Sequence, residues 1–204
     1  AIALMLLIRS RNQEKAAVAE NKAATAGDEG DDDSLQDTPN RIAKMYVNEI
    51  MSGRYEPAPN ATAFPNVGDD RYTGMLVVRS ELKSMCSHHH QTIGGKVSIA
   101  YIASEDGKVV GLSKLNRIVE QFGRRGAIQE QLTVAIHNAV DKICEGNLGV
   151  AVQVNATHAC VSCRGVKHGG ASMQTAKLTG AFLDEPSAKA EFYKNIELAE
   201  KCNH

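Results

Sequence analysis

The stretch KVSIAYIAS, residues 96–104, decides the fold class because its apolar residues Val97, Ile99 and Tyr101 alternate onto one face. Alternation of this kind, with many β-branched residues, is typical of a β-strand that buries one of its faces. The preceding stretch GMLVVRSELKSMC, residues 74–86, is also rich in β-branched residues. Together the two stretches predict a pair of neighbouring strands.

Two amphipathic helices are predicted after this strand pair. In residues 109–125 apolar side chains recur at helical spacing behind Ser113, which can serve as the N-cap. Residues 128–146 show the same spacing up to Gly146, and glycine commonly ends helices. The central part of the chain is therefore expected to add two helices to the strand pair.

A second strand pair is predicted to follow the helices. Residues 149–156 alternate as a strand, and residues 158–166 with residues 173–182 are expected to complete a hairpin. Residues 185–201 predict a terminal helix. The predicted order of the core is ββααββ, with both helices between the strand pairs.

Upstream of the core, residues 37–53 predict a helix in which Thr38 can cap and Pro39 fits the first helical position. Residues 55–70 contain several Pro, Asn and Gly residues, which indicates a loop. Residues 16–33 are Ala-rich and then acidic, and this composition predicts a mobile arm or a weak helix.

The overall composition is that of an ordinary soluble domain. Of the 204 residues, 43% are hydrophobic and 23% are charged, and the formal net charge is -1. A chain with this charge has no general cationic field to attract a nucleic-acid backbone, so nucleic-acid binding is not expected. Any anion site must come from local basic residues.

Two features of the chain bear on its location. The N-terminal AIALMLLI is apolar for only eight residues, far short of the roughly 20 that span a bilayer, and indicates part of an amphipathic helix. The five cysteines, an odd number in a chain of this size, favour reduced thiols. The sequence therefore predicts a cytoplasmic protein without a membrane segment.

The stretch CSHHHQ, residues 86–91, places a thiol beside three consecutive imidazoles. Cys86 and His89 have a spacing at which a tight turn can direct sulfur and nitrogen at one zinc ion. Cys160 offers a third ligand if the two strand pairs are neighbours in one sheet. Three protein ligands leave one tetrahedral position for water, whose pKa zinc lowers to about 7, so this arrangement predicts a hydrolytic site.

A structural zinc site is the alternative interpretation of the same residues. Cys160 and Cys163 form a C-x-x-C pair, and with both as ligands the zinc ion would have four protein ligands and no position for water. The residue pattern leaves both arrangements open.

Other residues have the chemistry to bind a nucleotide. An amide followed by a carboxylate at the start of the second central helix, Gln129 and Glu130, can read the N–H edge of a purine. Basic and hydroxyl side chains near the start of the first central helix, where free backbone N–H groups favour anions, suit a polyphosphate. The candidates at this helix are Ser113, Lys114 and Arg117. Arg164, which follows Cys160 in the chain, is a further candidate.

Five segments, in this order along the chain, resemble the signature segments of GTP cyclohydrolase I. They are DTPNRIAKMYVNEI, SMCSHHH, GLSKLNRIVEQFGRR, IQEQLT and THACVSCRGV. The resemblance runs from about Ser34 to the C-terminus. It implies an N-terminal arm over residues 1–36, partly helical or mobile, and a GTP cyclohydrolase I-like catalytic domain over residues 37–204.

The resemblance implies a particular fold, assembly and reaction. The fold is the tunnelling fold, or T-fold, an α+β fold in which ββααββ units with an antiparallel sheet and helices on one face assemble into a barrel. In this family the barrel is usually a pentamer, stacked face to face as a homodecamer. The substrate is GTP, and the products are 7,8-dihydroneopterin triphosphate and formate.

The resemblance also assigns roles to individual residues. The zinc ligands would be Cys86, His89 and Cys160, with Cys163 near the metal but not bound to it. His88 would protonate the imidazole ring of guanine as it opens, and His158 would move protons in the later steps. Gln129 and Glu130 match the guanine-recognition segment. The triphosphate contacts, which in this family come from more than one subunit, fall on Ser113, Lys114, Arg117 and Arg164.

The chain departs from the family pattern in two places. Ser87 stands where the family commonly has glutamate, and losing a carboxylate beside metal ligands can lower metal affinity or activity about 10 to 100-fold. The N-terminal arm is short and rich in Ala and Asp, so no regulatory protein partner is inferred.

Two other functions remain as alternatives. One is a nitrile-reductase-like T-fold enzyme without catalytic zinc. The stretch ELKS, residues 81–84, faintly resembles the motif of that family, but the lysine and the aromatic residue that should follow it are missing. The other is a catalytically silent, zinc-stabilised nucleotide-binding protein, which Ser87 and Cys163 allow.

Overall fold

The structure is a computed structural model that describes residues 37–57 and 62–201. Its internal contacts divide the chain into two units, Ala1–Pro57 and Ala58–His204. The predicted arm over residues 1–36 and the apolar N-terminal helix lie outside the described residues, so the predicted domain boundary stays a prediction.

In the first unit, the predicted helix is present but begins one residue earlier than expected. Helix α2 spans Thr38–Met45 and continues as one π-helical stretch, η1, over Tyr46–Ile50, before the short 3-10 helix η2, Ser52–Arg54. The N-cap is Asp37, not Thr38. The Asp37 carbonyl accepts the first backbone hydrogen bond of the helix, from the Arg41 N–H at 3.0 Å, and no side-chain cap is formed.

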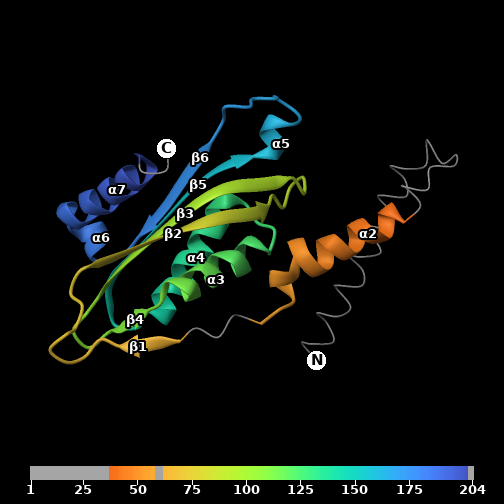
Figure 1. Ribbon diagram of the computed structural model, residues 1–204. Coiled ribbons are helices and arrows are strands. Elements are labelled where there is room, and N and C mark those ends of the chain that lie inside the picture. The colour runs from red at the N-terminus through yellow and green to blue at the C-terminus, as the bar shows by residue number, and fades with distance from the viewer. Residues whose placement is uncertain (1–36, 58–61, 202–204) are drawn as a thin grey trace, which may run out of the picture. The chain divides into compact units, whose positions relative to one another are not determined.

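The second unit is built on a four-stranded antiparallel sheet with the strand order β2-β3-β5-β6 (Figure 1). The strands span Met75–Met85, Thr92–Ala103, Asn147–His158 and Met173–Leu178. The two predicted strand pairs are therefore neighbours in one sheet, because β3 pairs with β5 along its length. Within the described residues, β2 and β6 form the two edges.

A second, two-stranded sheet was not expected. Strand β1, Ala63–Pro65, pairs antiparallel with β4, Lys108–Val110. The first of these strands lies in the stretch that was predicted to be a loop. It is only three residues long and contains a proline, so no alternating pattern marks it, and its partner is distant in the sequence.

Helices α3, Leu112–Gly123, and α4, Gln129–Ile143, cover one face of the four-stranded sheet (Figure 1). The core between them contains Val97, Ile99 and Tyr101, the three residues whose alternation predicted the strand. Helix α3 starts at Leu112 with Gly111 as its N-cap and no side-chain cap, so the prediction of Ser113 as the cap was wrong.

The opposite face of the sheet is covered by α6, Ala181–Asp184, and α7, Pro186–Lys201 (Figure 1). The smaller core on this side is formed by residues of β3, β5, α6 and α7, including Ala100, Ala151, Phe182 and Phe192. Residues of one strand therefore serve both cores in alternation, because successive side chains point to opposite faces. The protein is a mixed α+β structure with antiparallel sheets.

One predicted strand is a helical turn instead. Residues 159–162 form the short helix α5, Ala159–Ser162, directly after β5 ends at His158. The hairpin between β5 and β6 is thus closed by this turn and by the loop that follows it. None of the helices in the described part of the chain combines the length and the hydropathy of a membrane-spanning segment.

The side of α4 that packs on β6 carries polar residues, one of which is a buried histidine. His137 is 2% exposed, and its Nε2 lies 3.1 Å from Thr179 Oγ1. Burial lowers the pKa of His137, and the positive charge of Lys177 adds to this effect. The folded protein therefore favours the neutral imidazole.

We expect His137 to make folding stability depend on pH. Below about pH 6.5 the unfolded chain binds a proton that the folded chain excludes, so the free energy of unfolding should fall as the pH falls. In His137→Gln, which keeps a polar group but does not titrate, this fall should be smaller. Urea denaturation of both proteins between about pH 5 and 8 measures the difference. Parallel curves for the two proteins would contradict the assignment.

Candidate metal centre

The turn between β2 and β3 holds the CSHHHQ segment at one end of the sheet. Cys86 directly follows β2, its N–H donates to the Gln91 carbonyl at 2.8 Å, and its own carbonyl accepts from the His90 N–H at 2.9 Å. His90 takes a φ of 50°, which closes the turn. Cys86 also forms a parallel bridge with Ala127, which brings the start of α4 to this end of the sheet.

Cys160 reaches the same place from a distant part of the chain. Strands β3 and β5 pair so that Ile93, just after the turn, faces His158, and α5 then begins at Ala159. The possible ligand atoms of Cys86, His89 and Cys160 all lie within 4.8 Å of one another. The predicted trio therefore forms one cluster, which we call the thiol–imidazole cluster.

The cluster is partly buried and contains two adjacent thiols. Cys86 is 4% exposed, Cys160 is half-buried and His89 is exposed. Burial raises the pKa of the Cys160 thiol, and the neighbouring Cys86 sulfur raises it further, whereas the charge of Arg164 acts in the opposite direction. Two thiols held this close are suited to a shared cation, because binding a metal replaces their protons.

Cys163 does not belong to this cluster. It is exposed, and its sulfur lies 3.6 Å from the hydroxyl oxygen of Ser162. The group of possible ligands that the described residues bring together contains Cys86, His89 and Cys160 only. This arrangement favours a site with three protein ligands over one closed by both cysteines of the C-x-x-C pair.

Two further histidines stand beside the cluster. His88 is exposed next to His89, with their ring centroids 6.1 Å apart and the rings nearly perpendicular. His158, the last residue of β5, places its Nε2 2.8 Å from Oε1 of Gln129. Both predicted catalytic histidines are therefore at the same end of the sheet as the cluster.

The two residues predicted to bind guanine, Gln129 and Glu130, differ in their exposure to solvent. Glu130 is exposed in the first turn of α4, where a carboxylate is favourable. Gln129 is fully buried, and its side-chain N–H groups point into the protein. Sequence reasoning did not find this burial, because the partners of Gln129 belong to strands β5 and β6, distant along the chain.

The predicted triphosphate residues lie on two different parts of the chain, one just after helix α5 and three on α3. Arg164 is close enough to influence the Cys160 thiol. Gly123, the last residue of α3, packs tightly against Lys83 of β2, near the end of this strand that holds the cluster. A Cβ added to Gly123 would lie 2.7 Å from the carbonyl oxygen of Lys83. The other three residues, Ser113, Lys114 and Arg117, lie in the first half of this 12-residue helix. An α-helix of that length measures about 18 Å, so its start lies well away from the thiol–imidazole cluster.

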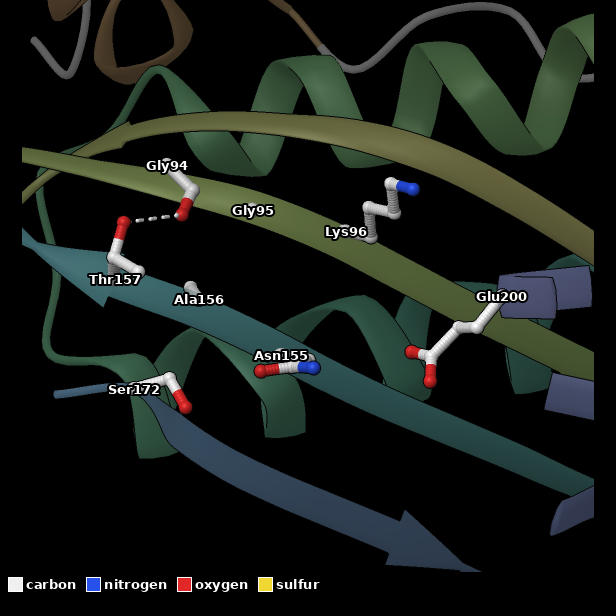
Figure 2. A pocket seen from close by; sticks show the side chains of 8 residues that line it. All are labelled: Gly94, Gly95, Lys96, Asn155, Ala156, Thr157, Ser172 and Glu200. Carbon is white, nitrogen blue, oxygen red and sulfur yellow. Dashed lines mark hydrogen bonds between the residues drawn. The ribbon is translucent and has the colours of Figure 1, made fainter. Parts of the chain in front are cut away.

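A pocket of about 440 Å³ lies on the other face of the sheet. Figure 2 shows Lys96, Asn155 and Thr157 along β3 and β5 in this pocket, with Glu200 of α7 at the right of the view. Thr157 donates to the Gly94 carbonyl at 3.2 Å, whereas its neighbour His158 contacts α4 on the opposite face. The pocket is therefore separate from the thiol–imidazole cluster.

The fold and the cluster define a class: a mixed α+β protein with a candidate metal site of two thiols and one imidazole at the end of an antiparallel sheet. A family model described as GTP cyclohydrolase I matches residues 16–197 of the chain. The chain belongs to the GTP cyclohydrolase I family.

Named relatives agree with this assignment. The GTP cyclohydrolase 1 of Aeromonas hydrophila subsp. hydrophila is 45% identical over 168 residues, which cover 81% of this chain and 75% of that protein. The enzyme of the same name from Vibrio vulnificus is 44% identical over 167 residues, with 81% and 75% covered. That of Haemophilus ducreyi is 43% identical over 167 residues, with 81% and 74% covered.

One solved structure is similar to part of the chain. The archaeosine synthase QueF-Like in the apo form covers 54% of this chain and 97% of its own, with a TM-score of 0.44 and 17% sequence identity.

Proposed function

We propose that this chain is a GTP cyclohydrolase I, which opens the guanine ring of GTP, releases formate and forms 7,8-dihydroneopterin triphosphate. Its membership in the family and its similarity to enzymes named GTP cyclohydrolase 1 support this function. The observation that carries the proposal is the thiol–imidazole cluster, whose three possible ligand atoms lie within 4.8 Å of one another.

The donor set fits zinc. Zinc is commonly bound by cysteine sulfur and histidine nitrogen, and here Cys86, Cys160 and His89 would hold it. When bound by three protein ligands, zinc supplies a Lewis acid and lowers the pKa of a water molecule to about 7. A closed structural site would need a fourth protein ligand, and Cys163 stands outside the cluster.

The chain's own residues would handle the substrate and its protons. His88, exposed beside the cluster, would donate a proton to the ring nitrogen of guanine as the five-membered ring opens. His158 would move protons while the ribose opens and the new ring closes. Glu130, exposed at the start of α4, would accept hydrogen bonds from the N–H edge of guanine. Histidine suits both proton-transfer roles because its ordinary pKa is about 6.5.

We further propose that the active site is shared between subunits. Arg164 lies near the cluster in its own chain, whereas Ser113, Lys114 and Arg117 lie in the first half of α3, the half further from the cluster. We therefore assign the triphosphate contacts of a GTP bound at the cluster to Arg164 and to Ser113, Lys114 and Arg117 of a neighbouring chain. Each edge strand of the described sheet, β2 and β6, pairs on one side only, which suits the T-fold barrel of a homodecamer.

The location proposed for this enzyme is the cytoplasm. Four of its cysteines, Cys86, Cys144, Cys160 and Cys163, are free thiols among the described residues. A reducing compartment would keep the two cluster thiols available for a metal.

The function is tested by incubating zinc-loaded protein with GTP and measuring formate together with the fluorescent oxidised pterin. Both products should appear in equal amounts. His88→Ala should retain zinc but lose about 100 to 10,000-fold in rate, the usual contribution of a general acid. A zinc-loaded wild-type protein that binds GTP without releasing formate would favour the silent nucleotide-binding alternative.

Zinc content should not depend on Cys163. We expect Cys163→Ala to bind one zinc ion per chain, as the wild type does, because its thiol lies outside the cluster. Metal analysis after dialysis against a weak chelator provides the measurement. Loss of zinc from this variant would identify a four-ligand structural site and would remove the basis for the proposed reaction.

A further inference from the structure

The side chain of Gln129 is enclosed and fully hydrogen-bonded. The residue is 0% exposed, and its Nε2 lies 3.2 Å from the Val154 carbonyl, 2.9 Å from the Met173 carbonyl and 3.1 Å from Thr175 Oγ1. Its Oε1 lies 2.8 Å from Nε2 of His158. Every polar atom of this amide therefore has a partner inside the protein.

These partners determine which way the amide faces. A backbone carbonyl only accepts hydrogen bonds, so the two carbonyls of Val154 and Met173 require the NH₂ group on their side. Reversing the amide would put its oxygen against two carbonyl oxygens and leave the NH₂ group facing His158. The oxygen of Gln129 must therefore be the atom that faces the imidazole.

Two threonines hold the amide in this orientation. Thr133 Oγ1 donates to the Gln129 backbone carbonyl at 2.9 Å. Its hydrogen is thereby used, so in the 2.6 Å contact between the threonine hydroxyls Thr175 is the donor. Thr175 in turn accepts from Gln129 Nε2. The bonds all run in one direction around a closed circuit of Gln129, Thr175 and Thr133, an arrangement in which hydrogen bonds strengthen one another.

The same logic fixes the proton on His158. Because Gln129 Oε1 can only accept, the imidazole Nε2 must donate and must carry a hydrogen. In the neutral ring the lone pair is then on Nδ1. His158 thus commits its Nε2–H to the protein, and Nδ1 is the ring nitrogen that can accept a proton.

We propose that Gln129 is a positioning residue for His158 and not a contact to the guanine ring. It holds the imidazole in its Nε2–H form and leaves Nδ1 as the atom that exchanges protons with the substrate. This inference rests on the proposed function for the catalytic part of the role of His158. It also revises the prediction from the sequence, which assigned Gln129 to substrate binding together with Glu130.

Kinetics distinguish the two roles of Gln129. In Gln129→Met, which keeps the length but lacks the amide, we expect kcat to fall about 100-fold, as for a misplaced catalytic group, with KM and the Kd for GTP unchanged within about twofold. Glu130→Gln should instead raise the Kd and KM for GTP. An increase in Kd for Gln129→Met comparable to that for Glu130→Gln would overturn the proposal.

A double-mutant cycle tests whether Gln129 acts through His158. In a His158→Ala background, Gln129→Met should lower kcat by less than about twofold, because the ring it positions is gone. Full additivity of the two effects would show that Gln129 acts independently of His158, and would contradict the inference.

A milder pair of variants covers the case in which Gln129→Met fails to fold. Thr175→Val removes the hydroxyl that accepts from the Gln129 amide and keeps the side-chain shape, so it should lower kcat less than Gln129→Met, with KM unchanged. The matched control is Thr157→Val, which removes a hydroxyl beside His158 on the other face of the sheet and should not change kcat. Equal kcat values for the two threonine variants would argue against the circuit.

The protonation pattern can be observed without turnover. Zinc-loaded protein labelled with ¹⁵N-histidine is examined by solid-state NMR at about pH 8.5, well above the ordinary histidine pKa of about 6.5. The signals of His158, identified by their absence from His158→Asn, should show a protonated Nε2 and an unprotonated Nδ1. The opposite pattern would refute the positioning role. The expected pattern in a protein that releases no formate would refute the proposed function alone.

Discussion

Replacing Cys160 by serine is expected to abolish both zinc binding and formate release. The substitution removes one of two sulfur donors from a cluster whose ligand atoms lie within 4.8 Å of one another. The remaining thiol and imidazole form a two-ligand site, which holds zinc poorly. Because a bound metal contributes several kcal/mol to such reactions, the rate should fall by about 1,000-fold or more.

The measurement combines zinc content with the initial rate of formate release from GTP. Cys163→Ser is the matched control, since it makes the same change three residues later at an exposed thiol outside the cluster. It should keep both zinc and activity. A Cys160→Ser protein with normal activity, or a control that loses as much as the variant, would show that the cluster is not the catalytic centre.

A second large effect is expected when two inactive variants are combined in one assembly. Cys160→Ser removes a ligand from the metal half of the proposed site. A double variant, Lys114→Ala with Arg117→Ala, removes two cations from the anion half, which lies in the first half of α3. Each charge-assisted hydrogen bond contributes about 1.5–3 kcal/mol, so losing two should lower kcat/KM by about 1,000-fold.

Mixed assemblies should recover activity because each half-site can come from a different chain. If subunits combine at random in equal amounts, about one quarter of the sites pair an intact metal half with an intact anion half. We therefore expect about a quarter of the wild-type rate after co-expression and purification through a tag on each chain. A mixture as inactive as its components would indicate that each site lies within a single chain.

The sequence predicts the elements of this fold well where they depend on local periodicity. Alternation of Val97, Ile99 and Tyr101 predicted β3, and all three residues are buried in the core beneath α3 and α4. The errors occur where non-local contacts decide the structure. Strand β1 exists because β4 lies beside it, and the segment after His158 is a helical turn although its composition suggested a strand.

The residues of the candidate site were also predictable only where local spacing links them. Cys86 and His89 are linked by their spacing in one tight turn, so their pairing was visible in the sequence. Cys160 joins them through the antiparallel pairing of β3 with β5, in which Ile93 faces His158. From residue chemistry alone, a site with three protein ligands and one closed by Cys163 were both open; the cluster in the structure favours the first.

Sequence alone therefore determined the family resemblance, most of the elements and the residue types able to bind a metal and a nucleotide, because these follow from local pattern and side-chain chemistry. Only the tertiary structure decided that Gln129 faces inward to His158 while Glu130 faces solvent, and that the end of α3 nearest the cluster is the one with Gly123, not the one with Ser113. Burial and distance depend on which strands and helices pack together, and contacts between residues far apart in the chain set that packing.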